Sequence, residues 1–159
     1  MYPVNPKDNC KISLPFGYKY PNSEPYKSWG VAGDVHKGVD IARKDKSGKT
    51  VYYIIAPIAG KIINVGEWNP PPQHTDTYLK YVLSHKEGSY VSIDSSSSDK
   101  GFRHILLHMY KVFVRPGQIV TKGTVLGIMG KTGMATGIHL HYGVKDTDGA
   151  WVDPKPYLT

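Results

Sequence analysis

Five of the seven histidines fall into three short groups, and the first group also contains an aspartate. The groups are His36-Lys37-Gly38-Val39-Asp40, His104-Ile105-Leu106-Leu107-His108 and His139-Leu140-His141. In an extended strand, side chains alternate between the two faces with a period of two. Positions 139 and 141 are therefore expected to point the same way, as are 104 and 108, and 36 and 40 if that segment is extended. Two neighbouring strands could thus direct one carboxylate and several imidazoles at a single point.

Such a cluster suits zinc, which takes nitrogen and oxygen ligands in a tetrahedron and, in catalytic sites, keeps one position for water. The histidine and aspartate of the first group, with one histidine of the third, would supply three ligands. Zinc lowers the pKa of bound water to about 7, which makes a hydroxide nucleophile near neutral pH. The remaining histidines could transfer protons or bind a developing oxyanion.

Each motif also has a simpler interpretation. An HxH pair in a strand is more often structural or exposed than catalytic, and only the joint occurrence of the three groups favours a metal site. His104 could be a strand residue on the face of His108 without any metal contact. We expect His74 and His85 to be rim or solvent residues, and the single cysteine, Cys10, to be an inert thiol.

Two types of zinc site are excluded by composition. The glutamates occur only at Glu24, Glu67 and Glu87, and none forms the HExxH motif of helical zinc peptidases. One cysteine provides neither an internal disulfide nor a cysteine-based zinc site.

Short runs of strand-forming residues separated by turn residues dominate the chain, and helical periodicity is scarce. Turn signals stand at Lys46-Ser47-Gly48, Pro57–Gly60, Arg115-Pro116-Gly117 and Thr147-Asp148-Gly149. The predicted strands are Lys11–Phe16, Gly38–Ala42, Val51–Ala56, Gly60–Val65, Tyr90–Asp94, Phe102–Met109, Thr124–Met129 and Ile138–Val144.

This spacing predicts an all-β fold: a mostly antiparallel sheet in a compact, sandwich-like or barrel-like domain with an open groove. The 159 residues suit one domain spanning 1–159, in which residues 1–35 form an irregular N-terminal lead-in rich in Pro, Gly, Tyr and Asn. A long excursion over residues 67–89 interrupts the strand pattern, and excursions of that length are often functional.

The charge balance indicates which classes of binding partner the protein is expected to have. Lys and Arg number 20 against 13 Asp and Glu, a net charge of +7, which favours polyanionic surroundings such as an anionic cell wall. The charge is spread along the chain without an Arg-rich tract or an RNP-like aromatic motif, so we expect no nucleic-acid partner. No apolar run reaches membrane-spanning length and no signal peptide is evident. We expect a monomer.

Several ordered blocks resemble the lysostaphin-type (LytM-like) zinc metalloendopeptidases, which cut peptidoglycan cross-links or stem peptides. The resemblance covers roughly residues 30–159. His36–Asp40 matches the family's HxGxD, and His139–His141 lies in the match to G-x-x-G-x-T-G-x-S-T-G-P-H-L-H-F. The other matching blocks are Ile55–Ile62, Val114–Gly123 and Val152–Leu158.

The resemblance implies a role for each site residue. His36, Asp40 and His141 would hold one Zn²⁺ per chain. His139 and His108 would be catalytic histidines that are not ligands, and together would position or deprotonate the zinc water and stabilise the oxyanion. The chain departs from the family pattern where Leu106 replaces the tyrosine of Y-x-H-L and Ile138 replaces the proline before HxH.

The sequence therefore predicts a zinc-dependent peptidoglycan endopeptidase that acts on the cell wall, outside the cytoplasm, with anionic wall polymers as a possible second partner. A phage lysis or tail-associated enzyme fits the absence of a signal peptide and of a wall-binding repeat. The alternative is a non-catalytic, zinc-containing wall-binding or virion-structural module. A non-haem Fe(II) oxygenase also uses two histidines and one carboxylate, but it usually places the first pair as HxD.

Overall fold

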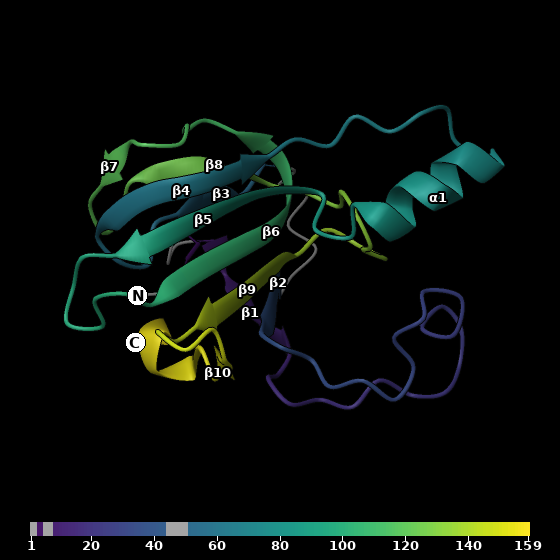
Figure 1. Ribbon diagram of the computed structural model, residues 1–159, viewed down its shortest axis with the longest axis horizontal. Helices are drawn as coiled ribbons and strands as arrows, with labels where there is room; N and C mark the ends of the chain where they lie inside the picture. Colours follow the sequence, from purple (N-terminus) through teal and green to yellow (C-terminus); the bar gives the residue numbers. More distant parts are fainter. Residues whose placement is uncertain (1–2, 5–7, 44–50) are drawn as a thin grey trace.

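The computed structural model describes residues 3–4, 8–43 and 51–159. The predicted turn at Lys46-Ser47-Gly48 lies outside these residues. Within them the chain forms ten strands, one α-helix and a 3₁₀ turn (Figure 1). The elements are β1 (Cys10–Leu14), β2 (Val39–Arg43), β3 (Tyr53–Ile55), β4 (Gly60–Gly66), α1 (Asp76–Ser84), β5 (Ser89–Ser95), β6 (Arg103–Val112), β7 (Ile119–Val120), β8 (Val125–Met129), β9 (Leu140–Lys145), β10 (Trp151–Val152) and η2 (Lys155–Leu158).

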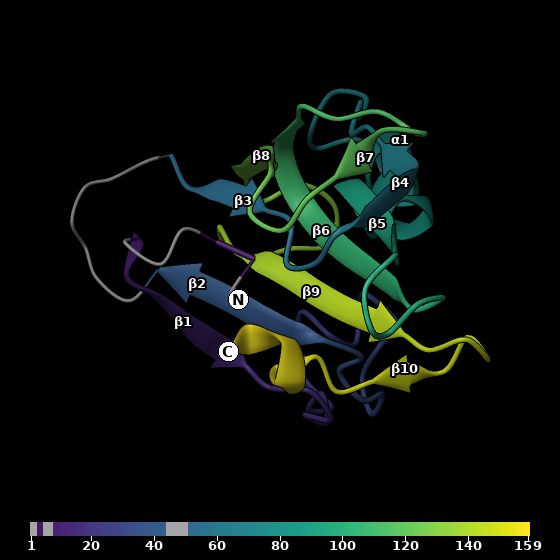
Figure 2. The ribbon, with the colours of Figure 1, turned by 90° about the vertical axis from the view of Figure 1, so that its left-hand side faces the viewer.

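All ten strands belong to one antiparallel sheet, which confirms the predicted fold class. The main path runs β1-β2-β9-β6-β5-β4-β7. The last residues of β6 pair instead with β8, which pairs with β3, while β10 pairs with β9. The sheet bends at β6 but does not close into a barrel (Figure 2).

The alternation of side chains along β6 and β9 separates a core face from an open face. Leu106 of β6, and Leu140, Tyr142 and Val144 of β9, are fully buried among apolar side chains of β2, β3 and β8. Burying each such side chain stabilises the fold by about 1.5–3 kcal/mol. His141 of β9 belongs to the opposite, open face, so the core fixes which way the HxH motif points.

A bulge in β6 places His104 and His108 on opposite faces of the sheet, not on the same face as predicted. His108 has φ 64°, and the pairing of β6 with β5 shifts register between Ser89 and Val91, opposite this part of β6. A bulge adds one residue and so reverses the face on which the next side chain lies. His104 therefore faces the core while His108 faces the open side, and the expectation that both point the same way is wrong.

The excursion over residues 67–89 contains the helix that strand-based reasoning did not predict. Thr75 caps it, because its Oγ1 accepts a hydrogen bond of 3.1 Å from the Tyr78 amide. The helix stands away from the sheet, at the same end of the molecule as the segment that leads into β2 (Figure 1). In the described part of the chain, this helix is too short and too polar to span a membrane.

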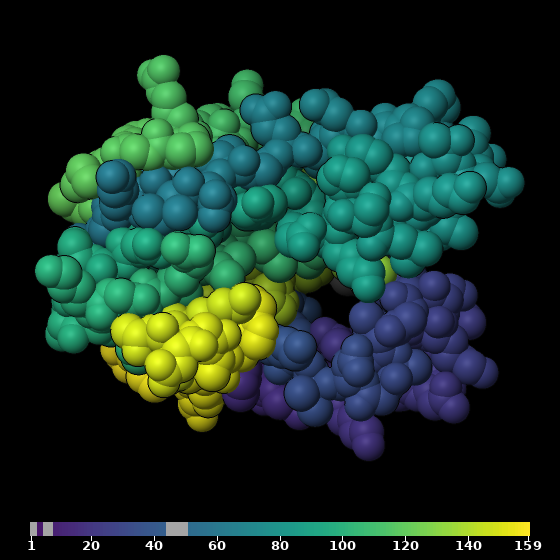
Figure 3. Space-filling model, viewed as in Figure 1, coloured from purple at the N-terminus to yellow at the C-terminus, as the bar shows by residue number. Residues whose placement is uncertain are grey.

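Two lobes frame a hollow in the molecular surface. One lobe is the lead-in segment before β2, and the other comprises α1 and its flanking residues (Figure 3). The open face of β6 and β9 lies at the base of this hollow, since a cavity lined by Leu107 and His141 also reaches His85 and Glu87 beside α1. The fold therefore leaves the His-rich face accessible from outside.

Candidate metal centre

The side chains of His36, Asp40 and His141 meet at one point on the open face. His36 Nε2 lies 3.1 Å from Asp40 Oδ1 and 3.0 Å from His141 Nδ1, and His141 Nδ1 lies 3.0 Å from Asp40 Oδ1. The three atoms thus form a nearly equilateral triangle. Metal–ligand distances of 2.0–2.1 Å in a tetrahedron place neighbouring ligand atoms about 3.3 Å apart. The triangle therefore has the size that a zinc-sized ion requires.

The chemistry of these three atoms also fits a cation. His36 Nδ1 donates to the carbonyl oxygen of Pro15 at 2.9 Å, so a neutral His36 presents an Nε2 lone pair to the cluster. The imidazole contacts of Asp40 with His141 and His36 outweigh the effect of burial and hold the pKa of Asp40 well below its usual value. Burial lowers the pKa of His141 despite the nearby carboxylate. Three acceptors that face one another need a proton or a metal ion between them.

Pairing between β2 and β9 brings the first and third motifs together. Asp40 and His141 are directly paired across the two strands. The glycine of the HxGxD motif permits this approach, because a Cβ on Gly38 would lie 2.6 Å from His141 Nε2 and 2.6 Å from the Tyr142 carbonyl oxygen. No L side chain fits there without displacing the ring of His141.

Two further imidazoles lie beside the triangle. His139 Nε2 is 3.7 Å from Asp40 Oδ1, and the His139 and His108 ring centroids are 4.9 Å apart. His139 Nδ1 donates to the Gly137 carbonyl and His108 Nδ1 to the Thr132 carbonyl, so both present Nε2 to the cluster. Burial and the neighbouring histidines lower the pKa of His108 to about 3, which leaves it neutral at pH 7.

Thr132 fixes the part of β6 around His108. The Thr132 hydroxyl donates to the Met109 carbonyl at 2.6 Å and accepts from the Ser89 amide at 3.0 Å. Gly88 has φ 65° and packs so closely against Thr132 that a Cβ would lie 2.4 Å from it. The bulged part of β6 is therefore braced from both sides.

An aromatic cluster from the lead-in borders the triangle, and sequence reasoning did not identify it. Tyr20 stacks on Tyr26 at 5.0 Å and meets the His36 ring edge-on, and Trp29 packs edge-on against Tyr26. Burial, with the nearby Asp40 carboxylate, raises the pKa of Tyr20, so its phenol stays protonated. The only sequence signal was the tyrosine content of residues 1–35, which does not say where these rings pack.

Histidines outside the cluster have other surroundings. His104 Nε2 donates to Asp99 at 2.8 Å and its Nδ1 accepts from the Tyr142 hydroxyl at 2.7 Å, so it makes no contact with the triangle. His85 stacks on Tyr81 at the end of α1, and His74 is exposed in the excursion. Cys10 is half-buried in β1, and its Sγ lies 3.6 Å from the Asp8 carbonyl oxygen.

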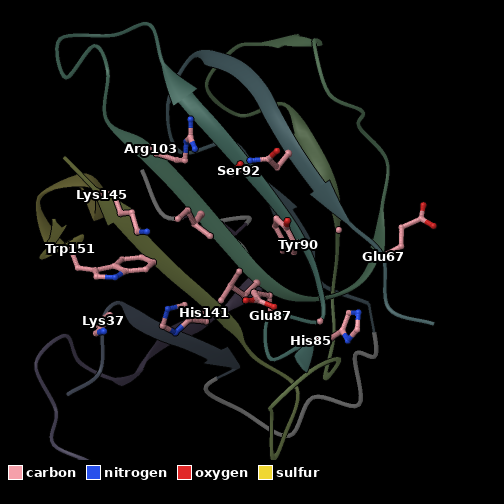
Figure 4. A pocket seen from close by; sticks show the side chains of 15 residues that line it. Lys37, Glu67, His85, Glu87, Tyr90, Ser92, Arg103, His141, Lys145 and Trp151 are labelled. Atoms are coloured by element: carbon pink, nitrogen blue, oxygen red, sulfur yellow. The ribbon is translucent and has the colours of Figure 1, made fainter. Parts of the chain in front are cut away.

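Two cavities meet at His141. The smaller, about 130 Å³, lies between the aromatic cluster and the loop 134–136, and all five site residues line it. The larger, about 620 Å³, is an open groove over the outer face of β9, β6, β5 and β4 (Figure 4). An extended chain lying in the groove would pass the triangle at His141.

The family model for peptidase family M23 matches residues 34–154, which include all three motif groups. The chain belongs to peptidase family M23. The family predicted from the sequence blocks is therefore confirmed.

The chain is similar to curated proteins and to solved structures. The peptidoglycan DD-endopeptidase ShyB of Vibrio cholerae is 37% identical over 96 residues, which are 55% of this chain and 22% of ShyB. A zinc-containing peptidase from Vibrio cholerae has a TM-score of 0.68 at 25% identity, over 96% of this chain and 37% of that chain. The catalytic domain of lysostaphin, an antimicrobial peptidase from Staphylococcus simulans, has a similar fold, with a TM-score of 0.66 at 24% identity over 94% of this chain and 92% of that chain. The chain spans less than a quarter of the length of the curated relatives that it matches.

Proposed function

We propose that this M23 chain is a zinc-dependent endopeptidase that hydrolyses peptide bonds in bacterial peptidoglycan. The observation that carries the proposal is the triangle of His36, Asp40 and His141 with two further imidazoles beside it. A structural zinc site is normally closed by four protein ligands. Here three ligand atoms converge. Hydrogen bonds to backbone carbonyls orient the neighbouring rings of His108 and His139, for which we propose a role other than metal binding.

In this proposal His36 Nε2, Asp40 Oδ1 and His141 Nδ1 hold the ion. Bound zinc supplies a water of lowered pKa and polarises the carbonyl of the scissile bond. Hydrolysis of that bond adds a water oxygen to the carbonyl carbon, breaks the C–N bond and leaves an amine that takes a proton.

The proton transfers fall to the two free imidazoles. His108 and His139 each keep the proton on Nδ1, so each Nε2 can accept a proton from the attacking water. The protonated imidazole can then donate to the developing oxyanion or to the leaving nitrogen. Tyr20 borders the same cavity as a protonated phenol and can donate a further hydrogen bond.

Peptidoglycan as the substrate is supported by the relatives and by the shape of the groove. ShyB is a peptidoglycan DD-endopeptidase by name. The open groove offers a shallow sheet surface rather than a deep pocket, which suits the small or D-configured residues of wall peptides. The net charge of +7 favours retention on an anionic wall.

The deciding experiment is a digest of purified sacculi from several wall chemotypes, with zinc, after chelation, and after zinc is restored. New amino termini are identified by mass spectrometry. We expect termini that disappear on chelation and return with zinc, and that are absent with His139→Ala. His74→Asn is the matched control, because His74 is exposed outside the site and its φ of 63° suits asparagine.

Two outcomes would replace the proposal. One zinc per chain with no new termini on any wall type would identify the non-catalytic wall-binding or virion-structural module. Bound iron and consumption of oxygen would identify an oxygenase instead. A role in phage lysis stays a prediction, and neighbouring phage genes are what would support it.

A further inference from the structure

The groove beside the candidate metal centre carries opposite charges at its two edges. Lys37, Lys145 and Trp151 line it along the β9 edge, and Glu67 and Glu87 line it at the loops that flank α1 (Figure 4). Between them the floor is formed by Ile105 and Leu107 of β6. A peptide that crosses the groove therefore meets positive charge on one side of His141 and negative charge on the other.

The cationic edge is built around a glycine. Gly143 of β9 carries no side chain where the Trp151 ring packs, and a Cβ there would lie 2.7 Å from that ring and 3.1 Å from the Lys37 carbonyl oxygen. Lys145 Nζ lies 4.7 Å from the centroid of the same ring, which holds the ammonium group at the groove. Trp151 thus positions one of the two lysines.

Both lysines are available to a ligand. Within the described residues, neither Lys37 nor Lys145 forms an ion pair, whereas the neighbouring Arg103 is neutralised by two hydrogen bonds to Asp94. Glu87 and Glu67 likewise have no ion-pair partner among these residues. The groove therefore presents two uncompensated cations and two uncompensated carboxylates.

We propose that Lys37 and Lys145 bind a free carboxylate of the substrate close to the cut bond, and that Glu87 and Glu67 repel one from the opposite edge. The inference rests on the proposed function and extends it to a substrate class. Direct cross-links through a diamino dicarboxylic acid carry such a carboxylate beside the cross-linking amide. Pentaglycine bridges carry none. The charges thus favour direct cross-links and fix the direction in which the peptide lies.

The strand geometry agrees with this assignment. Residues on one strand rise about 3.3 Å each, so Gly143 lies about 7 Å and Lys145 about 13 Å from His141 along β9. The Lys37 carbonyl oxygen lies 3.1 Å from the Cβ position at Gly143, which places Lys37 beside the nearer part of this span, and Lys37 also lines the groove. The free carboxylate of a direct cross-link is attached to the carbon that bears the cut nitrogen, so it lies at the His141 end of this span, nearest to Lys37.

The test uses two synthetic cross-linked peptides that differ only in a free carboxylate or a carboxamide on the diamino acid beside the cut bond. Exposed ion pairs are worth up to about fivefold each in affinity, so we expect kcat/KM to favour the acid about tenfold. Lys37→Gln with Lys145→Gln should bring this ratio close to one, mainly through KM of the acid. Lys145→Arg should keep it.

Lys122→Gln is the matched control, because it removes the same charge from an exposed turn outside the groove. It should keep the tenfold preference, and thermal unfolding checks that every variant is folded. Equal cleavage of acid and amide by the wild type overturns the inference alone, as does a preference that survives in the double variant. Failure to cut either peptide, with zinc bound, overturns the proposed function instead.

Discussion

Three of the four histidines at the candidate centre are held in one tautomer by the backbone. The Nδ1 atoms of His36, His108 and His139 donate to the carbonyls of Pro15, Thr132 and Gly137. Such outer hydrogen bonds fix the orientation of a ring and keep its other nitrogen ready to bind or to accept a proton. His141 is oriented the other way and uses Nδ1 toward Asp40. The backbone therefore determines which nitrogen each of these three rings presents to the candidate centre.

A pair of alanine variants separates ligand from catalyst. His141→Ala should lose both the metal and the activity, because one corner of the triangle disappears. His139→Ala should keep nearly one metal per chain and lose about 10²–10⁴-fold in kcat, as expected for a general acid–base group. Metal content by elemental analysis and turnover on a short wall peptide measure the two effects.

His74→Asn is the control for these variants, because His74 is exposed outside the site. It should change neither the metal content nor the turnover. Loss of metal in His139→Ala would show that the roles within the HxH pair are reversed. Full activity in His139→Ala would remove this residue from the mechanism.

At the scale of single residues, the sequence predicted which side chains come together at much of the candidate site. The spacing predicted that Asp40 joins His36 and that His139 joins His141, and the structure brings these four side chains together. It could not predict the bulge at His108, since a single residue with positive φ depends on how β5 and β6 pair. Tyr20 was also missed, because its contact with His36 depends on how the irregular lead-in folds back on itself, where Lys19 pairs with Val35. The catalytic and ligand roles themselves stay predictions.

At the scale of elements, local patterns predicted the strands better than the connections. The eight predicted strands all occur, with shifted ends, because period-two alternation reflects one buried face. β7 and β10 have two residues each, too few to show a period. Helix α1 was also missed, because it has only nine residues and buries only Val82.

The approach of β2 to β9 makes a prediction for Gly38. Gly38→Ala places a Cβ 2.6 Å from both His141 Nε2 and the Tyr142 carbonyl, so the strands must separate or the ring must turn. We expect metal affinity to fall about 10–100-fold, as for other changes around metal ligands. Competition with a zinc chelator measures it. Gly137→Ala, where a Cβ meets nothing within 4 Å, should retain the metal affinity. Equal affinities in the two variants would contradict the role of Gly38.

At the scale of the whole molecule, a buried polar network joins the C-terminus to the sheet. Asp99 accepts hydrogen bonds from Ser95 and His104, and His104 accepts one from the Tyr142 hydroxyl. Tyr157 of η2 packs edge-on against His104 at 4.7 Å. Burial would raise the pKa of Asp99, but the bonds from Ser95, His104 and Tyr157 outweigh it and lower that pKa. Burial also lowers the pKa of His104.

This network should make the fold sensitive to acid. In the unfolded chain, histidine binds a proton below pH about 6.5 and aspartate below pH about 3.9. In the folded chain, His104 and Asp99 bind protons only at lower pH, because their pKa values are lowered. The stability that these groups add above those values is thus lost as pH falls. Asp99→Asn should lower Tm by about 2–8 °C at pH 7, and the difference from wild type should shrink below pH about 4. Thermal unfolding of chelated protein measures it, and a constant difference would contradict the ionised role of Asp99.

The net charge of +7 makes a separate prediction about how the molecule meets the wall. Because the cations are spread over the surface, their attraction to a polyanion acts beyond the groove and is screened over about 10 Å at 0.1 M salt. Retention on walls that carry anionic polymers should therefore fall steeply as salt rises toward about 0.5 M, and should be weak on walls stripped of these polymers. Cleavage of a short neutral peptide should change little with salt, because the bond-breaking groups lie within one site. Co-sedimentation with intact and stripped walls measures the retention, and binding that persists equally on both would show that the wall is recognised through the groove rather than through net charge.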